Sequence, residues 1–135
     1  VTPEALIAEA FKEDLPGLDL TTDNLETKDI KGYAFLVAKS DLKLSGTLFF
    51  EKSIHHIYRQ SQIRWFFKDG DTVLKQQKIA SIQGNLLEIL KAERVALNFL
   101  GHLSGVATLT YRYVSACEGS PLKILDTRKT LPLYR

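Results

Sequence analysis

Residues 86–118 read LLEILKAERVALNFLGHLSGVATLTYRYVSACE, a long stretch with few helix breakers. Leucines recur in it at positions 86, 90, 97 and 100, a spacing that gives a helix an apolar stripe for packing on a core. Gly101 and Gly105 interrupt the stretch, and glycine disfavours the interior of a helix. The sequence therefore predicts two helices here, with a break between Gly101 and Ser104.

A shorter helix is expected near the start of the sequence. Thr2 can cap the free amides of a first turn, and Pro3 suits the first helical position. Pairs of apolar residues four positions apart follow, so the pattern predicts a helix that runs to about Asp14. Residues 15–29 are rich in turn-forming and acidic residues, which indicates an ordered loop.

The middle of the chain has the pattern of a β-rich module that includes one helix. Residues 32–40 (GYAFLVAKS) have the aromatic and branched content of a strand, and a second short strand is expected to end near Gly46. Apolar residues then recur at helical spacing over residues 50–58. A further strand is expected over residues 63–67 (IRWFF), followed by a tight turn at residues 69–71 and short apolar runs.

The bulk composition is that of one soluble globular domain. The chain has 135 residues, of which 44% are hydrophobic and 25% are charged, enough to bury a core. Lys and Arg number 18 against 16 Asp and Glu, and this near balance favours neither nucleic acid nor an acidic membrane as a partner. The sequence shows neither a signal-peptide pattern nor a bilayer-spanning apolar stretch. We therefore expect a soluble, cytoplasmic protein.

Neither a metal site nor a disulfide framework is expected in this sequence. Cys117 stands alone, so an intramolecular disulfide is excluded and a thiolate metal cluster cannot form. His55, His56 and His102 lack the further cysteines or carboxylates that would complete a ligand set. His55 and His56 are expected on the solvated side of their helix.

The last part of the sequence carries a first candidate site. Leu122–Leu125 is predicted to be a short buried strand, and the polar segment DTRKT (126–130) follows it at once. In parallel α/β folds, the loops after such strands build active sites. Arg128 offers a planar fork that suits a carboxylate or phosphate, Lys129 adds a compact positive charge, and Thr127 can donate from its hydroxyl. A solvated surface turn is the alternative interpretation.

Arg94 is a second candidate residue. It lies in the helical stretch between Glu93 and a run of apolar residues, near the edge of the expected buried face. An arginine there can bind an anion, form a structural ion pair or extend along apolar surface toward water. The pattern alone leaves these roles open. Asn98 is equally open, because asparagine disfavours a helix interior and needs a local reason.

Several segments together resemble one enzyme family. The strings AERVALNFLGHLSGVATLTYRYV (92–114) and ILDTRKTLP (124–132) resemble the signature of quinolinate phosphoribosyltransferases, also called nicotinate-nucleotide pyrophosphorylases (carboxylating). The strings EDLPGLDLTTDNL (13–25) and LVAKSDLKLSG (36–46) resemble further segments of that family. They occur in the family's order and cover nearly all of the chain.

The resemblance implies an α+β fold in two parts. Residues 1–95 would form an N-terminal α/β sandwich domain with its β-rich module. Residues 96–135 would supply linking helices and the first strand of an α/β barrel, the rest of which lies outside this sequence. The implied reaction, part of NAD biosynthesis, joins quinolinate to phosphoribosyl pyrophosphate with Mg²⁺ and yields nicotinate mononucleotide, pyrophosphate and CO₂. A single strand cannot close a barrel, so we expect this fragment to be inactive alone.

The resemblance also implies roles for individual residues. Arg128 and Lys129 match the family's substrate-binding pair, and Thr127 lies in the same loop. Arg94 matches an arginine that reaches into the site of the neighbouring subunit, so a homodimer with a shared active site, or a higher oligomer, is implied. Both substrates are anionic, which explains why these positions are cationic. No catalytic residue and no metal ligand is assigned in this fragment.

The sequence departs from the family pattern in places, and other readings exist. Pro16 and Leu18 in the acidic loop, and Leu133 near the end, stand where the family usually has glycine. Pyrophosphorylase-like proteins associated with molybdate transport share much of the helical motif, but Asp126 in DTRKT favours the quinolinate enzyme. A biotinyl or lipoyl module is a third reading, because residues 68–84 resemble hairpins of such domains, although no lysine is expected at an exposed hairpin tip.

Overall fold

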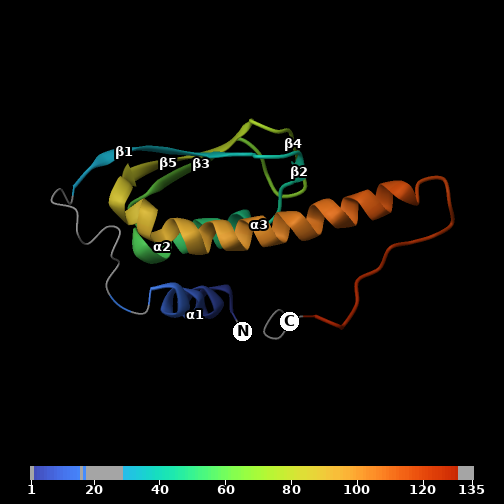
Figure 1. The fold of residues 1–135 in the computed structure, drawn as a ribbon, viewed down its shortest axis with the longest axis horizontal. Coiled ribbons are helices and arrows are strands. Elements are labelled where there is room, and N and C mark those ends of the chain that lie inside the picture. Colours follow the sequence, from blue (N-terminus) through green and yellow to red (C-terminus); the bar gives the residue numbers. More distant parts are fainter. Residues whose placement is uncertain (1, 16, 18–28, 131–135) are drawn as a thin grey trace.

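The computed structural model describes residues 2–15, 17 and 29–130 of the chain. An antiparallel sheet forms one layer, two helices cover its inner face, and a third helix packs on the far side of those two (Figure 1). The helices are α1 (Pro3–Asp14), α2 (Thr47–Ile57) and α3 (Leu86–Ala116). The strands are β1 (Lys31–Val37), β2 (Leu42–Lys43), β3 (Gln62–Trp65), β4 (Thr72–Val73) and β5 (Lys78–Asn85).

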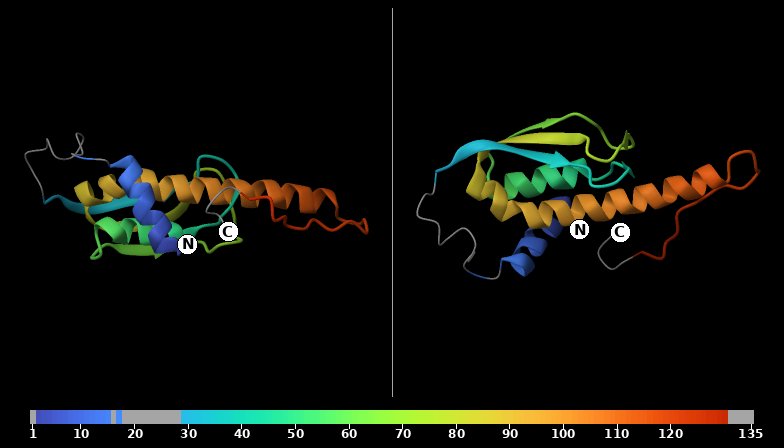
Figure 2. Two further views of the ribbon diagram at one scale, coloured as in Figure 1. Left: turned by 90° about the horizontal axis from the view of Figure 1, so that it is seen from below. Right: turned by 45° about the horizontal axis from the view of Figure 1, so that its top comes forward.

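Helix α1 has the predicted bounds. The Thr2 hydroxyl accepts a hydrogen bond from the Ala5 amide, and Pro3 occupies the first turn. Ile7 and Phe11 are buried against α2 and α3, and α1 crosses α3 obliquely (Figure 2). Most of the loop predicted over residues 15–29 lies outside the described residues.

The sheet has the strand order β1-β5-β3, with both neighbouring pairs antiparallel. Side chains alternate along β1, so that Ala34 and Leu36 pack on the core while Tyr33 and Phe35 face outward. The strands predicted over residues 32–40 and 63–67 are confirmed as β1 and β3. This mixed α/β architecture agrees with the sandwich expected from the sequence.

A short ladder extends the fold beside the sheet. Leu42 pairs with Val73, and Lys43 pairs with Thr72. The predicted turn between β3 and β4 is present, with Gly70 at φ +95° and the Lys68 amide donating to the Asp71 carboxylate. The other carboxylate of the turn, Asp69, accepts from the Gly46 and Thr47 amides at 3.1 Å and so caps α2. The turn therefore supports the start of α2. Lys68 in this turn and Lys75 in the turn between β4 and β5 are both exposed, so the expectation of no lysine at an exposed hairpin tip is wrong.

Helix α2 confirms the helical spacing seen from Phe50 onward. Phe50 and Ile54 are buried on its inner side. His56 is exposed, as expected, and its ring stacks on Phe11 of α1 with centroids 4.9 Å apart. His55 is half-buried, and its Nε2 lies 3.2 Å from the Ser61 carbonyl oxygen, so this histidine is less solvated than the sequence indicated.

The predicted break in the long helical stretch is wrong. Helix α3 runs without interruption from Leu86 to Ala116, through both Gly101 and Gly105. Neither glycine adopts a positive φ, and packing of the neighbouring turns outweighs the cost of about 1 kcal/mol per helical glycine. The helix also runs through the predicted boundary between residues 95 and 96, which stays a prediction.

The buried strand predicted over Leu122–Leu125 is also not found. These residues are exposed and belong to no strand, with Leu125 82% accessible. A strand needs a partner for its backbone groups. Among the described residues, none pairs with this segment. None of the helices in the described ranges is long and apolar enough to cross a membrane.

Gly46 and Gly105 provide a matched test of this backbone. Gly46 has φ +99°, and an added Cβ would lie 2.7 Å from Leu103 Cδ1, so Gly46→Ala should lower the free energy of unfolding by about 1–3 kcal/mol. Gly105 lies in a regular turn of α3 with open space around it, so Gly105→Ala should raise it by about 0.5–1 kcal/mol. Urea unfolding followed by circular dichroism measures both. Destabilisation by Gly105→Ala would contradict an uninterrupted α3.

Candidate functional site

Arg94 lies at the edge of the buried face of α3, on the side toward α1. Its neighbours Val95 and Ala96 are buried, at 3% and 0% exposure, whereas the Arg94 side chain is 68% exposed. Successive helical residues are about 100° apart, so an arginine beside two core residues lies at the edge of the buried face. The rigid packing of α3 thus fixes the backbone of Arg94 and leaves its guanidinium accessible.

The guanidinium of Arg94 contacts the last residue of α1. Its Nη1 donates to Asp14 Oδ1 at 2.9 Å, and the Asp14 side chain is only 17% exposed. A cavity of about 320 Å³ borders this pair, lined by α1 and α3. Asn98, one turn after Arg94, lines this cavity together with Asp14.

Thr127, Arg128 and Lys129 lie in an exposed segment beyond α3. The chain turns after α3 and runs back alongside it (Figure 1). Within the segment, the Lys129 amide donates to the Thr127 hydroxyl at 3.3 Å, and the Thr130 amide donates to the Arg128 carbonyl at 3.1 Å. These bonds form a local turn that presents two cationic side chains to solvent.

The structure does not bring all four predicted site residues into one pocket. Thr127–Lys129 lie close together because they are adjacent in the chain. The cavity beside Arg94 is lined by α1 and α3 alone among the described residues, and Thr127–Lys129 are not part of its lining. Arg94 and the cationic turn are therefore two separate elements of the described fold, and their roles as binding residues stay predictions.

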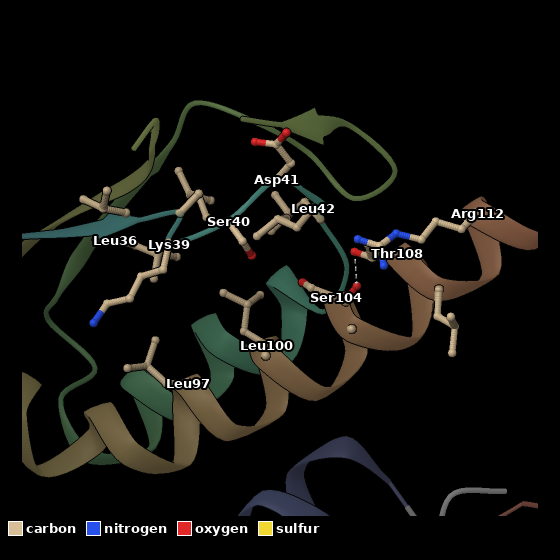
Figure 3. A pocket seen from close by; sticks show the side chains of 17 residues that line it. Leu36, Lys39, Ser40, Asp41, Leu42, Leu97, Leu100, Ser104, Thr108 and Arg112 are labelled. Carbon is tan, nitrogen blue, oxygen red and sulfur yellow. Dashed lines mark hydrogen bonds between the residues drawn. The ribbon is translucent and has the colours of Figure 1, made fainter. Parts of the chain in front are cut away.

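A larger cavity, which the sequence did not indicate, lies between α3 and the connection from β1 to β2 (Figure 3). Its volume is about 400 Å³. Leu97 and Leu100 of α3 point toward Leu36 and Leu42 across it, as Figure 3 shows, and Ser40 and Arg112 contribute polar groups at its border. Residues 36–42 and 97–112 are distant in sequence, so periodicity alone could not reveal the cavity.

Two hydroxyl side chains of α3 fix the position of β2 beside this cavity. Ser104 Oγ accepts from the Ser45 amide at 3.1 Å and donates to the Ser45 carbonyl at 3.0 Å. Thr108 Oγ1 accepts from the Lys43 amide at 2.9 Å. The signal was present in the sequence as two hydroxyl residues four positions apart, on one face of a helix. They satisfy backbone groups of β2 and of the residues just after it, outside the three-stranded sheet.

The described residues do not assemble a metal centre. In the ranges that the structure describes, no three His, Cys, Asp or Glu side chains come together in a way that could hold a metal ion. Within the described part of the chain, a pKa shift is resolved at the other end of α1. There a hydrogen bond from Lys52, with Nζ 2.5 Å from Glu4 Oε1, lowers the pKa of the Glu4 carboxyl.

Comparison with known proteins places this fold in one family. Residues 19–104 match the family model described as quinolinate phosphoribosyl transferase, N-terminal domain. Quinolinate phosphoribosyltransferase [decarboxylating] 2b, mitochondrial, of Nicotiana tabacum is 37% identical over 127 residues, 93% of this chain and 36% of the relative. The probable nicotinate-nucleotide pyrophosphorylase [carboxylating] of Bacillus subtilis is 34% identical over 96% of this chain and 45% of its own length.

A solved structure agrees with these matches. The nicotinate-nucleotide pyrophosphorylase from Francisella tularensis superposes with a TM-score of 0.90 at 35% identity, over 96% of this chain and 46% of that one. The chain thus spans between about a third and a half of the length of these relatives. On the match of sequence and fold, the chain belongs to the quinolinate phosphoribosyltransferase family, within the part that forms its N-terminal domain.

Proposed function

We propose that this chain is the front portion of an enzyme that transfers the phosphoribosyl group of phosphoribosyl pyrophosphate to quinolinate in NAD biosynthesis. Loss of one ring carboxylate as CO₂ would yield nicotinate mononucleotide, with pyrophosphate as the other product. The observation that carries the proposal is the TM-score of 0.90 to a nicotinate-nucleotide pyrophosphorylase over 96% of the chain. The described half would turn over no substrate alone, because it supplies only part of the fold of its relatives.

The exposed cations of the chain suit this chemistry. Quinolinate carries two carboxylates, and a dicarboxylate leaves water only when cationic groups pair with it. Arg128 and Lys129 form one cationic turn, and Arg94 provides a planar donor fork on a rigid helix. We assign substrate binding to these three residues, with the Thr127 hydroxyl supporting the turn through its bond to the Lys129 amide.

The bond-breaking step would rely on preorganised charge rather than on an acid or base of this chain. Leaving pyrophosphate develops negative charge, and fixed cations in a closed site stabilise such charge strongly. Mg²⁺ bound with phosphoribosyl pyrophosphate would neutralise the pyrophosphate oxygens. The described residues offer no three-residue ligand group for it, and we assign the metal to the substrate and to the remainder of the enzyme.

We further propose that two copies of the enzyme share each active site. Arg94 and the cationic turn are separate elements of one chain, and the Arg94 side chain is 68% exposed at the surface that a neighbouring subunit would contact. A homodimer in which Arg94 of one subunit completes the site of the other accommodates both facts. The cytoplasmic location expected from the sequence stays a prediction, since the named plant relative is mitochondrial.

Substitution in the cationic turn tests the substrate assignment. In the native polypeptide that contains residues 1–135, Arg128→Ala should lower kcat/KM for quinolinate on the order of 100-fold, because a charge-assisted pair to a buried carboxylate is lost. Lys123→Ala is the matched control, since Lys123 is an exposed cation five residues earlier. It should leave kcat/KM within about twofold. Equal losses in the two variants, or no formation of nicotinate mononucleotide by the unsubstituted protein, would refute the assignment.

Mixed dimers test whether the site is shared. Arg94→Ala and Arg128→Ala subunits should each be inactive as homodimers. After co-expression in equal amounts, half of the dimers carry one of each, and each such dimer keeps one intact site of two, so about a quarter of the wild-type activity should return. If Arg94 acted within its own subunit, no site would be intact and no activity would return. Arg59→Ala is the control for the loss of an exposed arginine. Arg59→Ala subunits should be active as homodimers, whereas Arg94→Ala subunits should not.

A further inference from the structure

The carboxylate of Asp14 has an unfavourable place in its own helix. Asp14 is the last residue of α1, where the helix dipole presents its negative end. A negative side chain there costs stability, typically about 0.3–1 kcal/mol. Local helix stability therefore does not explain the residue. The contact between α1 and α3 explains it instead, because Asp14 Oδ1 accepts a hydrogen bond from Arg94 Nη1 at 2.9 Å.

The two partners differ in how firmly they are held. Asp14 is 17% exposed and has a short side chain on the end of a helix. That helix is anchored by Ile7 and Phe11, at 1% and 5% exposure, and Phe11 stacks on His56 of α2. Arg94 is 68% exposed and has a long side chain with several rotatable bonds. In this pair, the aspartate is the fixed member and the arginine is the member that needs to be held.

We propose that Asp14 is a positioning residue that holds the Arg94 guanidinium in the orientation that a substrate carboxylate requires. The inference rests on the proposed function, in which Arg94 binds quinolinate. A guanidinium that is already oriented loses less conformational entropy when a carboxylate binds, so its affinity is higher. Asp14 touches no substrate in this scheme and acts only through Arg94.

A second ion pair in α1 supplies the control. At the first turn of α1, Glu4 Oε1 pairs with Lys52 Nζ of α2, so both ends of α1 are tied to the rest of the fold by one carboxylate each. If Asp14 served only to dock α1, removing either charge should have the same consequence. If Asp14 positions Arg94, only its removal should affect the substrate. Asp14→Asn and Glu4→Gln are isosteric changes that remove one charge each.

The first measurement uses the native polypeptide that contains residues 1–135 and needs no activity. The motion of the Arg94 guanidinium is followed by ¹⁵N relaxation of its Nε in Asp14→Asn, in Glu4→Gln and in the unsubstituted chain. The order of the Arg94 guanidinium should fall in Asp14→Asn and should be unchanged in Glu4→Gln, with the exposed Arg59 as an internal reference in each sample. Unchanged order in Asp14→Asn, or equal loss of order in both variants, would overturn the positioning role.

The second measurement uses the native polypeptide and quinolinate. Asp14→Asn should raise KM for quinolinate about tenfold, corresponding to the conformational freedom regained by one long side chain, and leave kcat within about twofold. Glu4→Gln should leave both within about twofold. An unchanged KM in an active enzyme overturns the inference while the proposed function stands. Absence of activity in the unsubstituted enzyme overturns the proposed function, and with it the role of Asp14 in substrate binding. The relaxation data then test only whether Asp14 orders the Arg94 guanidinium.

Discussion

Burial of one face of α3 is the interaction on which the rest of the fold depends. Ala92 and Ala96 on that face are completely inaccessible, and Phe99 beside them stacks on Phe49 of α2 with ring centroids 5.3 Å apart. The sheet contributes Ile82 to the same cluster, and α1 contributes Phe11. Each square ångström of apolar surface removed from water contributes about 25 cal/mol, so this shared cluster dominates the stabilising free energy. All three layers are therefore placed relative to α3.

Polar contacts then hold the parts that apolar packing cannot define. A ladder of two residues per strand, such as β2 with β4, has too few hydrogen bonds to persist in water alone. Here the backbone of β2 and the residues after it bond to the Ser104 and Thr108 hydroxyls of α3, and Asp69 caps the helix that follows. The cavity beside β2 keeps its shape for the same reason, because its two walls are tied together at Ser104.

Local patterns predicted the elements whose stability is local or whose period is clear. Thr2 and Pro3 located the start of α1, and aromatic and branched content identified β1. The patterns failed where tertiary context decides. Gly101 signals a helix break by propensity, but packed turns on either side carry α3 through it. Leu122–Leu125 has strand composition, yet extended backbone becomes a strand only beside a partner. Of the candidate site, the sequence located the cations but not the Asp14 partner or the cavity beside β2.

The position of Arg94 would let one helix serve both the fold and the proposed site. Val95 contributes to the core while Arg94, its neighbour, faces outward, so the packing that stabilises α3 also fixes the Cα of the arginine. Backbone rigidity does not extend to the end of a long side chain, which needs separate support within a fraction of an ångström to act precisely. That support comes from α1, whose own attachment is apolar through Ile7 and Phe11. The geometry around the guanidinium is therefore set by hydrophobic docking of a helix that needs no contact with substrate.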